Sequence, residues 1–370
     1  MTRDVLRTHS PLTYNLLGQA LQADLPFSAQ CIACHPLAGD ASNRRYYRLT
    51  LAEAPVDSLI LMQLADPEGF KASEEAVSGS APDVTELPFL NVLTFLRSLD
   101  IAVPASYYFD ESGGLLYLED FGDLTLAEAC AAGDQARCEQ LYEQAIDTLV
   151  QIHVRATWHE QRECLAFERA FDVPLFMWEF EHFLEYGVEA RQGKPLGDEA
   201  ARHIREAFQA MAEYIVVQPR VFTHRDYHSR NLMVAGKRLG VIDFQDALLG
   251  PATYDLASLL RDSYVALPEH VIDKMIDRYV RGMCSELDRA RQQELLLDDP
   301  VAFRRLFDYT SIQRNLKAAG RFVYIDRVKQ NPKFLADIPR TLGYVRNNLA
   351  KYPELHTLLI HLSPHVPEWQ

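Results

Sequence analysis

The stretch of sequence that decides the fold is Val221-Phe-Thr-His-Arg-Asp-Tyr-His-Ser-Arg-Asn-Leu-Met-Val234, followed after four residues by Leu239-Gly-Val-Ile-Asp-Phe-Gln-Asp246. Two apolar segments inside it, 231–234 and 239–242, lie on either side of the turn residues Ala-Gly-Lys-Arg. Apolar segments that flank a short turn with a glycine are typical of a β-hairpin. We therefore predict two paired strands, with a polar loop before the first and a polar residue directly after the second.

The side chains around this predicted hairpin are of the kind that binds a hard cation. The loop carries His224, Asp226 and Asn231, and Asp243 follows the second strand. Mg²⁺ prefers oxygen ligands and usually keeps water molecules and substrate phosphates in its coordination shell. Two carboxylates and an amide at one end of a hairpin therefore predict a magnesium site. The alternative for Asp226 and Asn231 is a turn stabilised by hydrogen bonds to their own backbone.

The sequence on either side of this stretch predicts two lobes. Upstream, segments rich in β-branched and aromatic residues predict a small antiparallel sheet. Leucines at steps of three predict a helix over 85–99, packed on that sheet. Downstream of residue 124, apolar residues recur at helical spacing, apart from the stretch quoted above. We expect an α+β fold with a β-rich N-terminal lobe over 1–120, a larger helical lobe over 121–370 and a hinge at about 118–124. The remaining predicted segments are strands at 45–51, 59–64, 107–109 and 115–120, helices at 11–25 and 135–155, and a polar loop at 66–82.

Composition and charge exclude several classes of function. The 370 residues include 37 Lys and Arg against 52 Asp and Glu, which gives a net charge of −15. A sequence-independent nucleic-acid binder needs the opposite excess, and no apolar run reaches the ~18 residues of a membrane span. Since the N-terminus has no apolar signal region, we expect a cytoplasmic protein with its six cysteines reduced. Cys31-Ile-Ala-Cys-His35 matches a haem-attachment pattern that requires export, and is interpreted as a chance match.

The spacing of the polar residues resembles a known catalytic core. His-x-Asp-x-x-x-x-Asn at 224–231, with Asp243 a dozen residues later, looks like the core of the kinase-like phosphotransferases. The segment Gly-Pro-Ala-Thr-Tyr-Asp-Leu-Ala-Ser-Leu at 250–259 narrows the resemblance to the aminoglycoside phosphotransferase/choline kinase group. Within that group the chain is similar to the bacterial N-acetylmuramate/N-acetylglucosamine anomeric kinases. The matching stretches are 39–48, 118–123, 224–233, 242–246 and 313–317.

The resemblance implies a bilobal protein-kinase-like fold and a role for each matching residue. Asp226 would orient the acceptor hydroxyl and accept its proton, and Asn231 and Asp243 would hold Mg²⁺ against the phosphates of ATP. His224 would brace the loop by a hydrogen bond, for instance to Asp255. For Asp255 the alternative is a helix cap. Asp246 is expected either to assist the metal or to bind sugar hydroxyls.

One feature departs from the kinase pattern. Kinases carry a strand lysine that pairs with the α- and β-phosphates, whereas the matching strand, 59–64, has none. We expect Arg44 or Arg45, preferably Arg45, to replace it, because a guanidinium suits phosphate. The alternative is a strand edge protected by charge. The resemblance also places adenine against the backbone of the inter-lobe connection, and the alternative there is an ordinary strand end. The matching positions are Leu118, Glu119 and Phe121.

Two groups of residues are candidates for acceptor binding. Arg314, Lys317 and Arg321 share one helical face, which would suit the lactyl carboxylate of N-acetylmuramate, although a solvated face is the commoner arrangement. The aromatic run 171–183 is more typical of core than of a sugar platform, and Glu179 and Glu181 beside it are candidates for hydroxyl contacts.

The expected function is therefore an ATP- and Mg²⁺-dependent kinase of a sugar hydroxyl, most consistent with the anomeric hydroxyl of N-acetylmuramate or N-acetylglucosamine. We expect a monomer with a small-molecule sugar substrate and neither a nucleic-acid nor a membrane partner. The alternatives are a kinase of the aminoglycoside, choline or homoserine type, and a non-catalytic nucleotide-binding pseudokinase, which the missing lysine suggests. A protein kinase is disfavoured because the Ala-Pro-Glu signature is absent.

Overall fold

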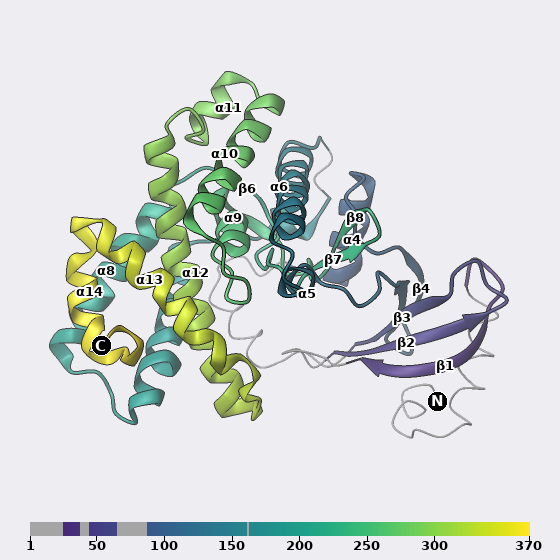
Figure 1. Ribbon diagram of the computed structural model, residues 1–370, viewed down its shortest axis with the longest axis horizontal. Helices are drawn as coiled ribbons and strands as arrows, with labels where there is room; N and C mark the ends of the chain where they lie inside the picture. Colours follow the sequence, from purple (N-terminus) through teal and green to yellow (C-terminus); the bar gives the residue numbers. More distant parts are fainter. Residues whose placement is uncertain (1–24, 38–43, 65–86, 161–162) are drawn as a thin grey trace. The chain divides into compact units, whose positions relative to one another are not determined.

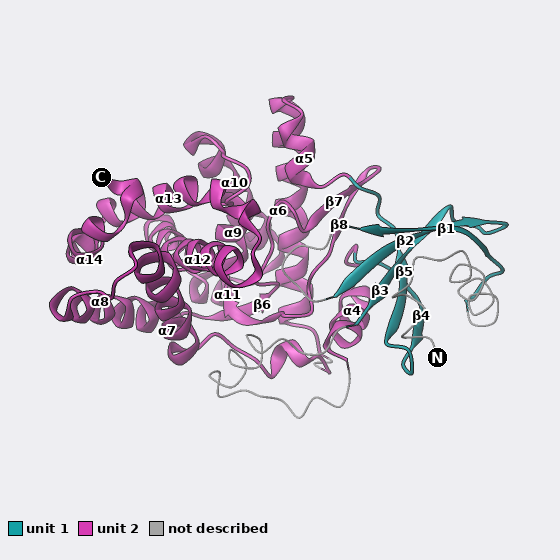
Figure 2. Cartoon of the chain, turned by 90° about the horizontal axis from the view of Figure 1, so that it is seen from below, with its two compact units in different colours: residues 1–72, 103–123 teal, residues 73–102, 124–370 magenta. Residues whose placement is uncertain are grey.

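The computed structural model describes residues 25–37, 44–64, 87–160 and 163–370. The predicted helix at 11–25 except its last residue, the turn at 39–43 and the loop at 66–82 lie outside these residues. The chain divides into two compact units, which Figure 2 shows in different colours. Unit 1 comprises residues 1–72 and 103–123, and unit 2 comprises residues 73–102 and 124–370.

Unit 1 is built on a five-stranded antiparallel sheet with the strand order β1-β2-β3-β5-β4. The segments predicted as strands are present, and β1, which contains the Cys31–His35 segment, adds a strand that the sequence pattern did not predict. Alternate residues of β2 are buried, at Tyr47, Leu49 and Leu51, as expected for a sheet with one face on a core. The strands are β1 (Gln30–Leu37), β2 (Arg45–Ala52), β3 (Ser58–Gln63), β4 (Ser106–Asp110) and β5 (Leu115–Glu119).

Helix α4 (Pro88–Ser98) belongs to unit 2, so the prediction that this helix packs on the small sheet is wrong. The buried face of α4 contains Leu93 and Leu96 of the predicted leucines, together with Phe89, Val92 and Phe95. The phenylalanines show what covers this face: the Phe89 ring lies 5.0 Å from that of Phe244, and the Phe95 ring 5.9 Å from that of Phe222. These aromatic contacts tie α4 to unit 2.

The rest of unit 2 is mainly helical, and helix α12 (Pro300–Lys329) packs against α9 and α13 (Figure 1) and also against the π-helical segment η2. Residues 306–316 of α12 are buried without interruption, as expected of a helix enclosed by neighbours on every side. The remaining helices are α5 (Leu126–Ala131), α6 (Gln135–Thr157), α7 (Val173–His182), η2 (Phe183–Ala190), α8 (Asp198–Val216), α9 (Thr253–Leu260), α10 (Glu269–Glu286), α11 (Arg289–Glu294), α13 (Ile338–Lys351) and α14 (His356–Leu362). Short 3-10 turns lie at Leu165–Phe167, Pro332–Asp337, Pro353–Leu355, Ser363–His365 and Pro367–Trp369.

Four short strands of unit 2 frame the polar loop. β6 (Arg220–Thr223) pairs with β9 (Leu248–Pro251), and β7 (Leu232–Ala235) pairs with β8 (Arg238–Val241). The second pair is the predicted hairpin, with the Ala235↔Arg238 pair closing its turn. The loop 224–231 thus runs from the end of one strand pair to the start of the other.

Cys130 of α5 and Cys138 of α6 form a disulfide, so the expectation that all six cysteines are reduced is wrong for this pair. Cys31, Cys34, Cys164 and Cys284 are free thiols. The capping box of α5, between Thr125 and Glu128, holds the start of that short helix, and the disulfide holds its end.

Reduction of this disulfide is expected to lower the free energy of unfolding by about 2–3 kcal/mol, because the cross-link restricts the unfolded chain over a short loop. The cysteines are separated by 8 positions. Urea unfolding of the wild type with and without reductant measures the difference. Cys130→Ser is the control, since reductant should not change its stability. Equal stability of the oxidised and reduced wild type would refute the prediction.

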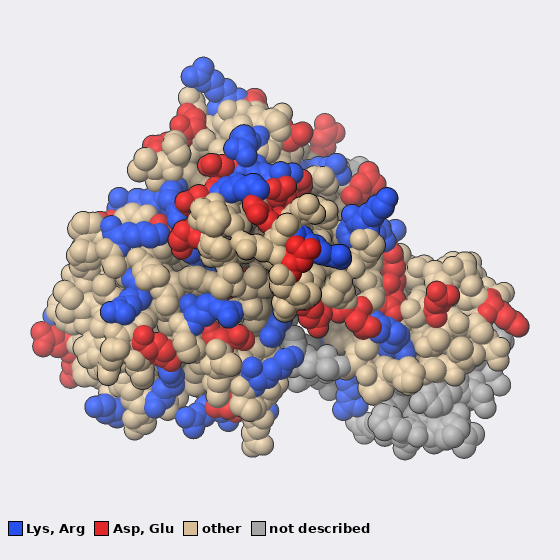
Figure 3. Space-filling view, viewed as in Figure 1, with Lys and Arg blue, Asp and Glu red and all other residues tan. Residues whose placement is uncertain are grey.

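No helix among the described residues is long and apolar enough to cross a membrane. On the face of unit 2 seen in Figure 3, basic side chains are interspersed with acidic ones. Such a mixture differs from the continuous basic surface that non-specific binding of nucleic acid requires.

Candidate active site

The loop 224–231 is fixed at both ends by carboxylates that are completely buried. Asp255 of α9 accepts hydrogen bonds from the backbone N–H groups of His224 (2.6 Å) and Arg225 (2.8 Å). Asp262, just after α9, accepts from the backbone N–H of Ser229 (2.9 Å). Buried backbone donors need partners, and this loop takes them from side chains. Asp255 makes no cap for α9, whose N-cap residue has no side-chain hydrogen bond.

Asp262 was missed in the sequence. The available signal was a carboxylate two helical turns beyond Asp255, at the end of the apolar run 256–260. A charged residue next to a fully buried helix needs a partner, and its partner is the loop.

His224 links the loop to the residue that precedes Asp243. Its Nε2 lies 3.0 Å from the carbonyl oxygen of Ile242, and its Nδ1 lies 3.3 Å from the backbone nitrogen of Asp226. With Nδ1 accepting from Asp226, Nε2 carries the proton and donates to Ile242. The imidazole therefore braces the loop against the end of β8, whereas Asp255 contacts the backbone of His224 and not its side chain.

The structure brings Asn231 and Asp243 together. The Asn231 amide nitrogen donates to the backbone oxygen of Asp226 (3.0 Å) and lies 3.5 Å from Oδ2 of Asp243. Since the nitrogen is used in this way, the amide oxygen is the atom that Asn231 offers to a cation. Gln245 donates to Oδ1 of Asp243 (2.9 Å) and to Asp246 (3.2 Å), which places both carboxylates at one amide group.

This oxygen-rich set fits Mg²⁺, which takes few protein ligands and keeps water and phosphate oxygens in its shell. Among the described residues, no group of three or more His, Cys, Asp or Glu is placed to hold a metal ion. Asp243 and Arg225 have positive φ angles, 65° and 81°. Residues other than glycine rarely adopt this conformation, and it is concentrated at functional sites.

Asp226 is ionised at neutral pH. Burial raises the pKa of its carboxyl, but the positive charges of nearby side chains outweigh burial and hold the pKa at about 2. These side chains are Lys317, His228, Arg225 and Arg314, in order of decreasing effect. An ionised carboxylate can accept a hydrogen bond from a hydroxyl group and then its proton.

The basic stripe on α12 is not a solvated face. Arg314 is buried and donates to Oδ1 of Asn315 (3.3 Å). The Lys317 side chain is 23% exposed, and its Nζ lies 2.8 Å from Oε1 of the buried Glu179. Of the three basic residues of the stripe, Arg314 is thus buried and Lys317 is partly buried, and the charges of both act on Asp226.

The aromatic run 171–183 is largely core, as the commoner interpretation predicts. Phe171, Phe176, Phe180 and Phe183 are at most 1% exposed. Trp178 is only partly buried and stacks on His182 with 5.7 Å between the ring centroids.

The residues predicted to bind the nucleotide lie in unit 1. Arg44 directly precedes β2, and Arg45, which is exposed, pairs with Gln63 of β3 in the sheet register. Leu118 and Glu119 end β5, and Phe121 is buried. The backbone N–H of Glu119 donates to Ala105 (2.8 Å), so hydrogen bonds to a base at this strand end must come from other backbone groups.

Arg48 of β2 was missed in the sequence. Its guanidinium forms ion pairs with Asp120 and Asp123, both at 2.6 Å. These contacts hold the pKa of Asp120 below its usual value, although burial opposes the shift. Arg48 fixes the segment that follows β5.

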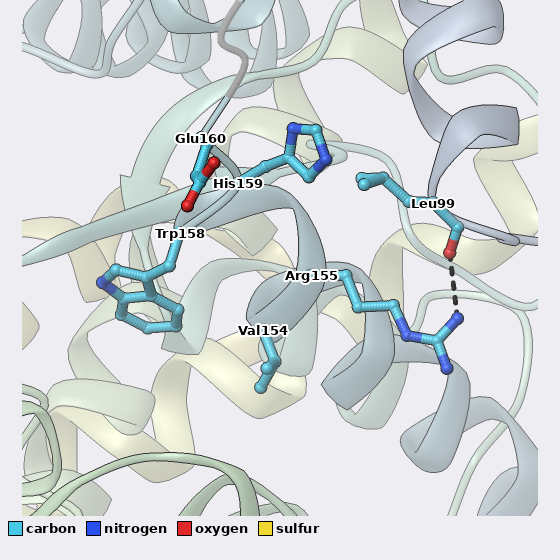
Figure 4. Close-up of a pocket in the computed structure, with 6 residues that line it drawn as sticks. All are labelled: Leu99, Val154, Arg155, Trp158, His159 and Glu160. Atoms are coloured by element: carbon cyan, nitrogen blue, oxygen red, sulfur yellow. Dashed lines mark hydrogen bonds between the residues drawn. The ribbon is translucent and has the colours of Figure 1, made fainter.

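A surface pocket near the ends of α4 and α6 contains none of the predicted site residues. It is lined by Leu99, Val154, Arg155, Trp158, His159 and Glu160, and Arg155 donates to the Leu99 carbonyl oxygen across it (Figure 4). The pocket does not hold the oxygen-rich set described above.

Comparison with proteins of known sequence finds relatives that are named N-acetylmuramate/N-acetylglucosamine kinases. An N-acetylmuramate/N-acetylglucosamine kinase of Pseudomonas aeruginosa is 29% identical over 324 residues, which are 87% of this chain and 86% of the relative. One of Neisseria meningitidis is 30% identical over 331 residues, 88% and 89% of the two chains.

Solved structures share the fold. A choline kinase from Streptococcus pneumoniae superposes with a TM-score of 0.57 at 15% identity, over 91% of this chain and 99% of the other. An ADP-bound aminoglycoside phosphotransferase superposes with a TM-score of 0.53 at 14% identity, over 90% and 96%. The fold is thus protein-kinase-like, with an antiparallel N-terminal sheet and a mainly helical C-terminal part, as predicted.

The model of the phosphotransferase enzyme family matches residues 33–293, which include most of the sheet of unit 1 and the loop 224–231. This match covers well over half of the chain. The protein therefore belongs to the phosphotransferase enzyme family and transfers a phosphoryl group to a hydroxyl acceptor.

Proposed function

We propose that the protein is an ATP- and Mg²⁺-dependent kinase that phosphorylates the anomeric hydroxyl of N-acetylmuramate or N-acetylglucosamine, as a monomer in the cytoplasm, for recycling of cell-wall sugars. The observation that carries the proposal is the loop geometry, in which the Asn231 amide donates to the Asp226 backbone and lies 3.5 Å from the Asp243 carboxylate. The positive charges that lower the pKa of Asp226 support its role as a base. The names of the relatives support the acceptor. The Cys130–Cys138 disulfide is an observation against a reducing compartment.

In this proposal, catalysis depends on positioning and charge. Asp226 accepts a hydrogen bond from the acceptor hydroxyl, orients its oxygen for attack and takes its proton. Asn231 and Asp243 hold Mg²⁺, which would neutralise charge on the transferred phosphoryl group. His224 and Asp255 keep Asp226 in place through the hydrogen bonds described above.

Unit 1 supplies the nucleotide contacts in this proposal. Arg44 or Arg45 pairs with the phosphates in place of the missing lysine, since a guanidinium forms paired hydrogen bonds to phosphate oxygens. Leu118, Glu119 and Phe121 lie beside the adenine, where Leu118 and Phe121 supply the apolar surface that such sites need.

The acceptor contacts come from unit 2. Lys317 and Arg314 attract the lactyl carboxylate of N-acetylmuramate, and Asp246 accepts hydrogen bonds from sugar hydroxyls. The action of both positive charges on Asp226 supports this assignment.

The deciding experiment is phosphorus NMR of the product formed from ATP, Mg²⁺ and N-acetylmuramate. We expect an α-1-phosphate. A 6-phosphate would overturn the anomeric assignment. Turnover restricted to choline, homoserine or an aminoglycoside in a parallel acceptor panel would overturn the sugar assignment.

Reversal of both charges in Arg44→Glu/Arg45→Glu is expected to raise the KM for ATP about tenfold or more, because a charge-assisted hydrogen bond to phosphate is replaced by repulsion. The KM for the sugar should stay within about twofold, since no acceptor contact is changed. Steady-state kinetics with ATP as the varied substrate measures the effect. Arg202→Glu, on the exposed face of α8, is the control. An unchanged KM for ATP would exclude both arginines from phosphate binding.

A further inference from the structure

Glu179 of α7 is a buried carboxylate whose oxygens are already bound. Its side chain has no exposed surface. Oε1 accepts from Nη2 of Arg225 (3.0 Å) and from Nζ of Lys317 (2.8 Å), and Oε2 accepts from the Gln313 amide (2.6 Å). A buried charge is costly unless it is paired and hydrogen-bonded. Both oxygens of Glu179 are thus engaged inside the protein, which disfavours the contact to sugar hydroxyls for which the sequence made Glu179 a candidate.

The fold brings Glu179 to Lys317 through a close approach of two helical segments. A Cβ atom on Gly320 of α12 would lie 2.8 Å from the Cα of Phe183 and 3.2 Å from the carbonyl oxygen of His182. Gly320 is one turn beyond Lys317, and Phe183 is one turn beyond Glu179. Only glycine at position 320 allows the two backbones to come this close, and the ion pair forms one turn away.

Both cations bound to Glu179 act on Asp226. Arg225 directly precedes it, and its backbone is held by Asp255 while its side chain is held by Glu179. Lys317 has the largest effect among the positive charges that keep Asp226 ionised. The Glu179 side chain has no exposed surface, whereas the Lys317 side chain is 23% exposed. Lys317 is therefore the member of this ion pair that can contact a substrate.

We propose that Glu179 is a positioning residue for acceptor binding, which holds the Lys317 ammonium beside Asp226 in the orientation that binds the carboxylate of N-acetylmuramate. The inference rests on the proposed function and deepens it, because it assigns a preference for an acidic acceptor to one buried ion pair. N-acetylglucosamine, which lacks the carboxylate, does not use this contact.

The protonation state of Lys317 depends on groups from α7, from α9 and from the loop 224–231, and on groups of its own helix, α12. Burial and the charge of Arg225 lower the pKa of Lys317, but Glu179, Tyr254 and Asp226 raise it above its usual value. His182 of α7 also faces this lysine, and burial together with Arg321 and Lys317 lowers the pKa of His182 to about 4, so it is neutral at neutral pH. Removal of the Glu179 charge therefore lowers the pKa of Lys317, and the ammonium is lost at lower pH.

The test compares Glu179→Gln with Glu206→Gln. Glu206 lies on α8, is exposed and is paired with Arg202 of the same helix, so it is a glutamate outside the proposed site. Glu179→Gln should raise the KM for N-acetylmuramate about tenfold and leave that for N-acetylglucosamine within about twofold. The alkaline limb of kcat/KM for N-acetylmuramate should move to lower pH by about one unit or more. Glu206→Gln should behave like the wild type.

Two further variants separate positioning from a general structural effect. In Glu179→Gln/Lys317→Arg, the alkaline limb should disappear, because a guanidinium stays charged over this range. A ¹³C NMR titration of the lysine side chains, with the Lys317 signal identified by its loss in Lys317→Arg, should show the same shift without any turnover.

The outcomes are distinct. If the wild type is active but the Lys317 titration is unmoved in Glu179→Gln, the inference is overturned and the proposed function stands. The inference is also overturned if both sugars lose activity equally with no change in the pH profile, because that is the signature of a structural defect alone. A wild type inactive with both sugars overturns the proposed function, and with it the acceptor named here.

Discussion

Asp226→Asn is expected to lower kcat by about three orders of magnitude, with the KM for ATP and for the sugar within about threefold. The amide has the shape of the carboxylate but cannot take the proton of the attacking hydroxyl. The loop should keep its structure, because the hydrogen bonds that tie residue 226 to His224 and Asn231 are made by its backbone. The loss is therefore expected in the chemical step and not in binding.

Steady-state kinetics with N-acetylmuramate and ATP measures this effect. Asp277→Asn, on the exposed face of α10, removes one carboxylate elsewhere and should retain full activity. A kcat within tenfold of the wild type, in an Asp226→Asn protein with unchanged thermal stability, would show that Asp226 is not the base.

The pH dependence of the same residue is also determined by its surroundings. A carboxyl group with its pKa lowered to about 2 binds a proton only in strong acid, so Asp226 produces no loss of rate between about pH 8 and pH 5. Its contribution to folding stability is present above the ordinary pKa of an aspartate and is lost as the pH falls toward 2. An acid limb above pH 5 must come from another group.

The parts of the fold that depend on local sequence could be predicted, and those that depend on distant partners could not. The hairpin of β7 and β8 follows from a short turn between two apolar segments, and the structure confirms it. The helix near residue 90 was also predictable, but its partner was not, because helical periodicity does not specify which surface covers the buried face. Phe89 meets Phe244 across more than 150 positions of sequence.

The site shows the same division. Asp226, Asn231 and Asp243 could be proposed from the sequence because one short motif carries them, and in the structure the Asn231 amide nitrogen lies 3.5 Å from the Asp243 carboxylate. The roles of Glu179 and Asp262 could not be recognised from a motif, because their partners in the loop are 46 and 33 positions away in the sequence. Their role is visible only when the loop backbone and the buried cations are seen to need acceptors.

Asp243→Asn is expected to raise the Mg²⁺ concentration for half-maximal activity about 10- to 100-fold, because it removes one negative charge and one carboxylate oxygen from the proposed metal site. Asparagine is the informative substitution at this position. Asp243 has a φ of 65°, a left-handed conformation that asparagine adopts readily and that alanine adopts only under strain. The amide oxygen of the asparagine can still accept the hydrogen bond from the Gln245 side chain, so the local structure should persist.

Activity over a Mg²⁺ titration at saturating ATP and sugar measures this prediction, and the thermal stability without metal shows whether the fold is intact. Asp246→Asn is the matched comparison, because its carboxylate lies at the same Gln245 amide but belongs to the proposed sugar contacts. We expect Asp246→Asn to raise the KM for the sugar with little change in the Mg²⁺ requirement. If Asp246→Asn changed the Mg²⁺ requirement and Asp243→Asn did not, the metal ligand would be Asp246 and not Asp243. Equal loss in both variants would indicate that the two carboxylates share the cation, since each then supplies part of the charge that holds it.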